Sequence, residues 1–208
     1  MEKIQIAVLA SGRGSNFQAI LDAIDTGECA AEVKVLITDN PEAKAIERAE
    51  SKNIPVEIID KKAVPDREQF DLEIKKKLDE YKVQLVVLAG YMRIIKSKEL
   101  LDAYKYKIIN IHPSLLPAFK GSTNAQHDAF DYGCKVSGLT IHFVTDDVDG
   151  GPIIHQKCVD ISGCSSGDEV AEKIIKSEHE AYAEVVDSFA KGKYEVQGSR
   201  TLYTLREA

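Results

Sequence analysis

The sequence predicts an α/β protein with a mostly parallel, twisted sheet, helices on both faces and antiparallel strands in its C-terminal half. Apolar segments alternate with segments of helical periodicity through the first half, which is typical of βαβ units. Residues 4–10 are almost wholly apolar, as in a strand buried on both faces. Later, residues 136–144 alternate in polarity and residues 152–159 form another expected strand, which changes the character of the second half.

The elements follow one another without a linker or repeat, so a single domain is expected. The predicted strands of the first half are residues 4–10, 32–38, 54–59, 83–89 and 107–111. The predicted helices between them are residues 17–27, 41–51, 66–81 and 96–103. A long helix is expected at residues 167–190, and the alternating tail at 194–205 predicts an edge hairpin.

Composition excludes several classes of protein. The chain has 208 residues, 44% hydrophobic and 29% charged, with a formal net charge of −7, which disfavours a nucleic-acid scaffold. No apolar run approaches the roughly 18 residues of a membrane span. The cysteines are scattered without a CxxC pair, so we expect free thiols in a reducing cytoplasm. They are Cys29, Cys134, Cys158 and Cys164.

The loop SGRGSN, residues 11–16, follows the first strand and precedes a helix. Glycines allow backbone N–H groups to approach an anion, and a helix N-terminus favours negative charge. The loop lacks both the GK[ST] ending of an ATP-binding loop and the GxGxxG of a dinucleotide fold. It predicts either a monophosphate site or an ordinary turn in which Ser15 or Asn16 caps the helix.

Asn110 and His112 lie two residues apart at the end of a strand, so their side chains point the same way. An amide donor and an imidazole there suit the stabilisation of an oxyanion and proton transfer. Ligands bind beyond the carboxyl ends of parallel strands, where the loops after residues 10, 89 and 111 should meet. Asp149, in the loop TDDVDGGP, is expected to pair with His112 and raise its pKa, unless the loop is a solvated acidic turn. Its spacing does not fit a calcium loop, and no metal is expected.

Glu178 lies on the apolar stripe of the last expected helix. An inward-facing carboxylate needs a partner or a ligand, so Glu178 is either part of a structural network or faces a substrate. His142 alternates into one face of its strand and is interpreted as structural or as a support for site residues.

Five motifs occur in one order along the chain: SGRGSN, LAGYMRI, NIHPSLLP, HFVTDDVDGGPI and SEHEAY. Together they resemble the glycinamide ribonucleotide formyltransferase family over essentially the whole chain. The resemblance implies a Rossmann-like formyltransferase domain at residues 1–208. Within it, residues 1–105 would form a nucleotide- or phosphate-binding half and residues 106–208 a catalytic and folate-binding half.

The resemblance also implies roles for individual residues. His112 would be the general acid and oxyanion partner, Asn110 would bind the oxyanion, and Asp149 would raise the pKa of His112 and assist proton transfer. The other implied contacts are Gly14, Ser15 and Asn16 with the substrate phosphate, Glu178 with the ribonucleotide, and Arg67, Met92, Arg93, Ile94, Ile95 and Asn110 with folate. From its local sequence alone, Arg67 could equally be an ordinary residue of a first helical turn.

The implied reaction is transfer of the formyl group of 10-formyltetrahydrofolate to the primary amine of glycinamide ribonucleotide in de novo purine biosynthesis. The amine would attack directly, through an oxyanion-stabilised tetrahedral intermediate, with 10-formyltetrahydrofolate as cosubstrate and without a metal. The expected partners are these two small molecules, with no nucleic acid and no membrane, and the expected state is a monomer or homodimer. The chain departs from the family pattern at Lys120, Lys173 and Ile175.

Three alternatives fit part of the pattern. Formyltetrahydrofolate deformylases use a related domain but normally carry an additional N-terminal regulatory domain, and their motifs depart from SGxGSN and HPSLLP. Methionyl-tRNA formyltransferases carry an additional C-terminal domain and a tRNA surface, which fit poorly with 208 residues and a charge of −7. A non-catalytic nucleotide- or folate-binding protein is the third, and the intact Asn110, His112 and Asp149 argue against it.

Overall fold

A computed structural model describes residues 2–206, which contain a seven-stranded sheet and a separate two-stranded hairpin. The strands of the large sheet are β1 (Ile4–Leu9), β2 (Ala31–Thr38), β3 (Val56–Ile58), β4 (Leu85–Leu88), β5 (Ile108–His112), β6 (Val136–Phe143) and β7 (Ile153–Asp160). The helices are α1 (Ser15–Asp25), α2 (Ala45–Glu50), α3 (Arg67–Glu80), α4 (Lys98–Ala103), α5 (Ala125–Asp131) and α6 (Gly167–Lys191). The hairpin consists of β8 (Gly192–Gln197) and β9 (Arg200–Leu205).

The large sheet has the strand order β3-β2-β1-β4-β5-β6-β7. Strands β1 to β5 pair in parallel, whereas β6 is antiparallel to both β5 and β7. The predicted mixture of a parallel first half and an antiparallel second half is therefore confirmed. One sheet runs through both halves of the chain, because β5 pairs with β4 on one side and β6 on the other.

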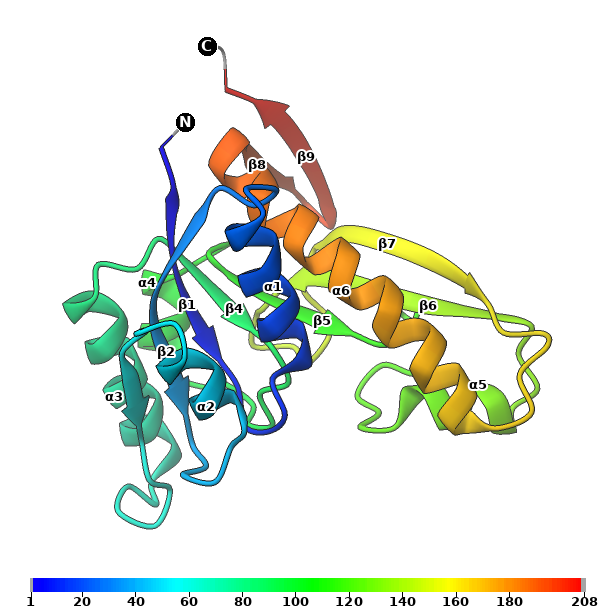
Figure 1. The fold of residues 1–208 in the computed structure, drawn as a ribbon, viewed down its shortest axis with the longest axis horizontal. Coiled ribbons are helices and arrows are strands. Elements are labelled where there is room, and N and C mark those ends of the chain that lie inside the picture. Colours follow the sequence, from blue (N-terminus) through cyan, green and yellow to red (C-terminus); the bar gives the residue numbers. More distant parts are fainter. Residues whose placement is uncertain (1, 207–208) are drawn as a thin grey trace.

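Helices cover both faces of this sheet, as predicted (Figure 1). Side chains of α1, α2, α5 and α6 share one buried cluster with the strand residues that point to their side. Side chains of α3 and α4 share a second cluster with the opposite set of strand residues. Along β1, for example, Ile6 and Val8 belong to the first cluster, whereas Ala7 and Leu9 belong to the second. This alternation explains why β1 is apolar on both faces from Ile6 to Leu9.

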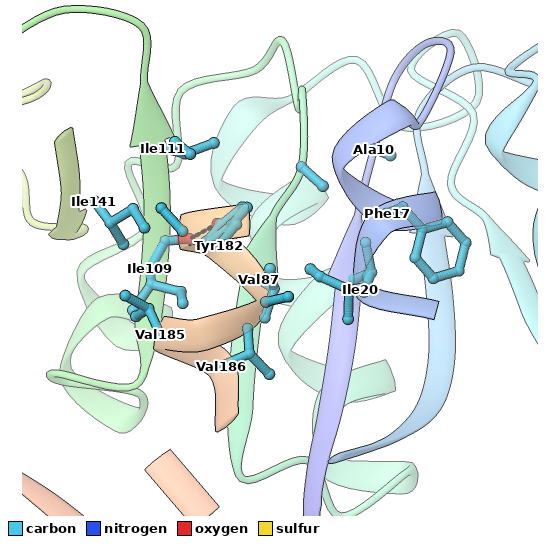
Figure 2. Close-up of a cluster of buried hydrophobic side chains, with 14 of the residues drawn as sticks. Ala10, Phe17, Ile20, Val87, Ile109, Ile111, Ile141, Tyr182, Val185 and Val186 are labelled. Atoms are coloured by element: carbon cyan, nitrogen blue, oxygen red, sulfur yellow. Dashed lines mark hydrogen bonds between the residues drawn. The ribbon is translucent and has the colours of Figure 1, made fainter. Parts of the chain in front are cut away.

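Helix α6 is fixed to the sheet by Tyr182, which is fully buried among apolar side chains of β4, β5 and α6 (Figure 2). Its hydroxyl group lies 2.9 Å from the carbonyl oxygen of Leu88 and 3.1 Å from that of Ile109. Burial of a tyrosine hydroxyl normally requires such a partner. Through this contact α6 is held against β4 and β5, close to the strand ends that carry the candidate site.

Several element boundaries differ from the sequence prediction. The helix expected from Pro41 begins at Ala45, because the Asn40 side chain accepts a hydrogen bond from the Glu42 N–H and closes a turn at residues 40–43. Helix α5 was not predicted, and its 7 residues, about two turns, show too few periodic positions for recognition. The C-terminal hairpin forms as expected, but β8 and β9 make their own sheet rather than extending the edge of the large one.

Two further observations concern the classes excluded above. Within residues 2–206, no helix is both long enough and apolar enough to cross a membrane. All four cysteines are free thiols, as expected.

Candidate active site

The three loops that follow β1, β4 and β5 meet at one edge of the sheet, as predicted. The Ser11 N–H donates to the carbonyl oxygen of Gly90 at 3.1 Å, and the Ser11 hydroxyl accepts from the Met92 N–H at 3.0 Å. Strand β5 brings Asn110 beside Leu88 at the end of β4. The edge thus joins residues that the sequence separates by about 80 to 100 positions.

Four side chains form a compact group, termed the catalytic cluster: Asn110, His112, His142 and Asp149. The Asp149 carboxylate lies 3.5 Å from Nδ1 of His112 and 3.6 Å from Nε2 of His142. The amide nitrogen of Asn110 lies 3.4 Å from the same Nε2 of His142. Strand register explains this arrangement, because Asn110 of β5 is paired with His142 of β6. The expected contact between Asp149 and His112 is therefore present.

Both ring nitrogens of the buried His112 face oxygen acceptors. Nδ1 faces the Asp149 carboxylate, and Nε2 lies 3.2 Å from the carbonyl oxygen of Phe119. Two acceptors favour the protonated imidazole, and Asp149 acts in the direction the sequence predicts. Burial has the larger effect, however, so the pKa of His112 lies below its ordinary value of 6.5 rather than above it. Asp149 thus raises the pKa of His112 as expected, but desolvation outweighs the carboxylate and the net shift is downward.

Asp149 is held in an uncommon backbone conformation, with φ at 50°. A left-handed non-glycine residue costs on the order of 1–3 kcal/mol and persists only where its surroundings hold it. The Gly121 N–H donates to its carboxylate at 3.1 Å, while the two histidines flank the same group. The contact with His142 is the largest of the effects that lower the pKa of Asp149, so the carboxylate stays ionised.

His142 links the cluster more directly than its sequence position indicated. Its Nδ1 lies 2.9 Å from the carbonyl oxygen of Phe143, and its Nε2 lies 3.4 Å from the amide nitrogen of Asn110 and 3.6 Å from the Asp149 carboxylate. The Asn110 amide carries two N–H groups, so at least one remains to donate to a ligand. Strand alternation predicts the orientation of the His142 side chain, but the partner of His142 depends on the register between β5 and β6.

A cleft beside the catalytic cluster is lined by Asn110, His142, Asp149 and the segment 91–95. Met92 and Ile94 in its wall are large apolar side chains that are 70% and 44% exposed, so they offer apolar surface to a ligand. The guanidinium of Arg93 lies 4.0 Å from the centre of the Phe70 ring. These are the residues 92–95 that the resemblance assigns to folate. Arg67 is exposed at the start of α3 and does not line this cleft.

The loop at residues 11–16, termed the phosphate loop, is anchored through its backbone carbonyl oxygens. The carbonyl oxygens of three consecutive residues, Ser11, Gly12 and Arg13, accept hydrogen bonds from Asn40, Ala45 and Arg48 respectively. Gly14 is the N-cap of α1, and no side chain caps that end. The interpretation that Ser15 or Asn16 caps the helix is therefore wrong, since both lie inside its first turn. The first backbone N–H groups of α1 are left for a ligand.

Gly14 permits this geometry because it adopts a left-handed conformation with φ at 67°, and a Cβ atom there would lie 2.9 Å from Cβ of Ala45. Two residues further on, the Asn16 amide donates to the Glu178 carboxylate of α6 at 3.0 Å. Burial raises the pKa of Glu178. The side-chain amide oxygen of Asn16, Oδ1, is buried with no hydrogen-bond partner among the described residues. Asn16 and Glu178 thus form a polar pair whose bonding is incomplete.

The sequence matches the formyl transferase family model over residues 4–186. It is 43% identical over 182 residues to the phosphoribosylglycinamide formyltransferase of Bacillus subtilis (strain 168), covering 88% of this chain and 92% of that protein. The chain belongs to the formyl transferase family. Within that family, two relatives that it matches along 92% and 89% of their length are the phosphoribosylglycinamide formyltransferases of Bacillus subtilis (strain 168) and Escherichia coli (strain K12).

Solved structures give the same placement. The structure of glycinamide ribonucleotide transformylase 1 from Symbiobacterium toebii superposes with a TM-score of 0.92 at 41% identity, covering 97% of this chain and 94% of that one. A formyltetrahydrofolate deformylase from Pseudomonas syringae pv. tomato superposes with a TM-score of 0.86 at 26% identity, covering 97% of this chain and 66% of that one. Membership of the family makes this chain an enzyme of formyl transfer and implies a folate-type formyl donor and small-molecule substrates.

Proposed function

We propose that this enzyme transfers the formyl group of 10-formyltetrahydrofolate to the primary amine of glycinamide ribonucleotide, as a step of de novo purine biosynthesis in the cytoplasm. The observation that carries the proposal is the catalytic cluster beside a cleft, with a separate uncapped helix N-terminus at the same sheet edge. Strands β1 and β5 are separated only by β4. The two sites are therefore about 10 Å apart along the sheet, a span that a small phosphorylated sugar bearing a glycinamide can bridge.

The phosphate end of the substrate is assigned to the phosphate loop. Free N–H groups at the first turn of α1 and the helix dipole both favour a dianion. Gly14 allows the backbone to come close, and Ser15 adds a hydroxyl group. Asn16 and Glu178 offer an acceptor and a carboxylate for the hydroxyl or amide groups of the ribonucleotide, which supports their assignment to that substrate.

The donor is assigned to the cleft formed by residues 91–95 and the loop of Asp149. Exposed apolar side chains at Met92 and Ile94 suit the flat rings of a folate, and Arg93 suits a carboxylate of its tail. Arg67 is retained as a further contact with that tail, which an exposed position at the start of α3 permits. The residues 1–105 and 106–208 then both contribute to the donor site, while the catalytic cluster belongs to the second half.

Chemistry follows from the position of the cluster. The amine nitrogen attacks the formyl carbon, and the carbonyl π electrons move to the formyl oxygen. A free N–H of Asn110 and the Nε2–H of His112, which exchanges the Phe119 carbonyl oxygen for the formyl oxygen, stabilise this oxyanion, each worth roughly 3–4 kcal/mol in comparable sites. The bond between the formyl carbon and the folate nitrogen then breaks, and the proton lost by the amine is transferred to that nitrogen through His112.

No step needs a metal ion or a covalent enzyme intermediate. In residues 2–206 the structure groups no three His, Cys, Asp or Glu side chains in a way that could hold a metal.

Whether the enzyme is a monomer or a homodimer stays a prediction.

A spectrophotometric assay with 10-formyltetrahydrofolate, run with and without glycinamide ribonucleotide, tests this function. We expect loss of the formyl group from the donor only when the amine is present. Equal loss without the amine would instead make the enzyme a hydrolase of the deformylase type. Binding of both molecules with no transfer would indicate a non-catalytic binding protein.

A further inference from the structure

Three consecutive residues, 119–121, contact His112 and the loop that carries Asp147 and Asp149. The carbonyl oxygen of Phe119 lies 3.2 Å from Nε2 of His112. The Lys120 ammonium group lies 2.7 Å from the Asp147 carboxylate, and the Gly121 N–H donates to Asp149 at 3.1 Å. Two of these three contacts reach the catalytic cluster through the backbone, and the third is an ion pair beside it.

The ion pair lies against Gly150, the residue that follows Asp149. A Cβ atom on Gly150 would lie 1.9 Å from Oδ2 of Asp147 and 2.7 Å from Nζ of Lys120. The absence of a side chain at Gly150 therefore makes room for the pair. Because Asp147 and Asp149 belong to the same turn, closed by the Gly150 N–H and the Asp147 carbonyl oxygen, the pair fixes the turn that carries the catalytic carboxylate.

Both sides of this contact have backbone conformations that need support. Phe119 has φ at 57° and Asp149 has φ at 50°, in the left-handed region that non-glycine residues rarely adopt. The Phe119 carbonyl oxygen contacts His112, and the Asp149 carboxylate accepts from the Gly121 N–H, and both contacts would be lost if the segment moved away. The ion pair between Lys120 and Asp147 is the charged contact that draws these two strained turns together.

We propose that Lys120 is a positioning residue, which holds the segment 119–121 over His112 and Asp149 through its ion pair with Asp147. This role rests on the proposed formyl transfer insofar as Asp149 serves His112 in that reaction. Lys120 touches neither reacting atom and acts through the turn at residues 147–150. Its loss loosens the Gly121 N–H from Asp149 and lowers the fraction of enzyme in which the carboxylate faces the imidazole.

The chain offers a closely matched control for substitution of Lys120. The pair Lys157–Glu180 has the same 2.7 Å separation, with side chains 42% and 66% exposed, against 38% and 64% for Lys120 and Asp147. Lys157→Met and Lys120→Met each remove one positive charge and one exposed ion pair. They differ in that the Lys157 pair joins β7 to α6 and contacts no residue of the catalytic cluster.

The first measurement is amide hydrogen exchange at Gly121 in the enzyme without substrates, followed by NMR. We expect Lys120→Met to speed this exchange about twofold to fivefold, the range typical of exposed ion pairs, with no change for Lys157→Met. Lys120→Arg should restore the wild-type rate, and Lys120→Met should have no further effect in an Asp147→Asn background. Gly150→Ala, which displaces the pair without changing a charge, should also speed the exchange.

The second measurement is steady-state turnover of the same variants. We expect kcat to fall about twofold to fivefold in Lys120→Met, with the KM for the ribonucleotide unchanged, and the difference from wild type to shrink at high salt as the pair is screened. Equal Gly121 exchange in Lys120→Met and Lys157→Met would overturn the proposal. So would an unchanged kcat accompanied by a higher KM for the donor, which would make Lys120 a donor contact.

Failure of this proposal can be told apart from failure of the proposed function. A wild-type enzyme that formylates no ribonucleotide contradicts the proposed function, whatever Lys120 does. The exchange at Gly121 needs no substrate, so it still supports or overturns the positioning role of Lys120 in that case.

Discussion

The catalytic cluster and the phosphate loop lie at one edge of the sheet but differ in how their polar groups are satisfied. In the catalytic cluster, Asp149 contacts both histidines and His142 contacts Asn110, so the groups hold one another in place before any ligand arrives. In the phosphate loop, no side chain caps the first turn of α1, and the side-chain amide oxygen of Asn16 is buried without a partner in the described structure. Under the proposed function, the comparison indicates that the groups for the chemistry are preorganised, whereas the ribonucleotide would complete its own binding site.

The largest expected effect comes from the catalytic cluster. His112→Ala should lower kcat at least about a hundredfold, because it removes both an oxyanion donor and the proton carrier. The circular dichroism spectrum should stay that of the wild type. His127→Ala is the matched control, since His127 pairs with Asp168 away from the cluster. Near-normal turnover in a folded His112→Ala enzyme would contradict the proposed role of His112 in oxyanion stabilisation and proton transfer.

Asn110→Ala should lower kcat about a hundredfold, since it removes one oxyanion donor while His112 remains. KM for the ribonucleotide should change little, because the phosphate loop is untouched. A variant with normal kcat and a raised KM would show instead that Asn110 only binds substrate. The split between kcat and KM is measured by steady-state kinetics with each substrate varied in turn.

Substitution in the phosphate region should show the opposite split. Glu178→Gln should raise the KM for the ribonucleotide about tenfold, the loss of one charged hydrogen bond, and leave kcat within a few-fold of wild type. The neighbouring Glu180→Gln is a control, as Glu180 pairs with Lys157 on the surface. An unchanged KM would separate Glu178 from the substrate.

Glu178→Gln should also change the dependence of stability on pH. Burial raises the pKa of Glu178, so its ionised form destabilises the folded state. Well below the ordinary carboxyl pKa of 4.5 both side chains are neutral and the two enzymes should unfold at the same temperature. As the pH rises through and above that value, the variant should become the more stable. A variant that is less stable at neutral pH would contradict the cost of burying this carboxylate.

The smallest expected effect concerns the pKa of His112. The Asp149 carboxylate raises this pKa against the larger effect of burial, so Asp149→Asn should lower it further. NMR titration of the His112 ring, with His127 as an internal reference, measures the change. A pKa that rises or stays constant in Asp149→Asn would show that the carboxylate does not act on this imidazole.

Local patterns made the scaffold predictable from the sequence. Hydrophobic residues repeating every two or every 3.6 positions located the strands and most helices. Because the carboxyl ends of parallel strands meet at one edge of a sheet, residues 11–16, 90–95 and 110–112 were expected to lie together. The Asn110–His112 pair follows from strand alternation alone. Features set by contacts across long stretches of chain were not predictable. The pairing of Asn110 with His142 depends on the β5–β6 register, and the Lys120–Asp147 contact depends on two loops meeting.

The electrostatics show the same division. Sequence placed a carboxylate near His112, which gave the direction of that one effect, but not the burial that reverses the net pKa shift. It likewise placed Glu178 on the buried stripe of α6 without identifying Asn16 as its partner, 162 residues away. Burial and partners are properties of the assembled core, so they become known only when the helices are placed on the sheet.

The most direct test of the account follows the formyl carbon itself. Donor with an isotopically labelled formyl group is incubated with glycinamide ribonucleotide and the wild-type enzyme, and the products are identified by mass spectrometry. We expect the labelled formyl group to appear on the glycinamide nitrogen in an amount equal to the tetrahydrofolate released. His112→Ala should slow the formation of both products to the same extent. Label recovered as free formate, with the ribonucleotide unchanged, would contradict it.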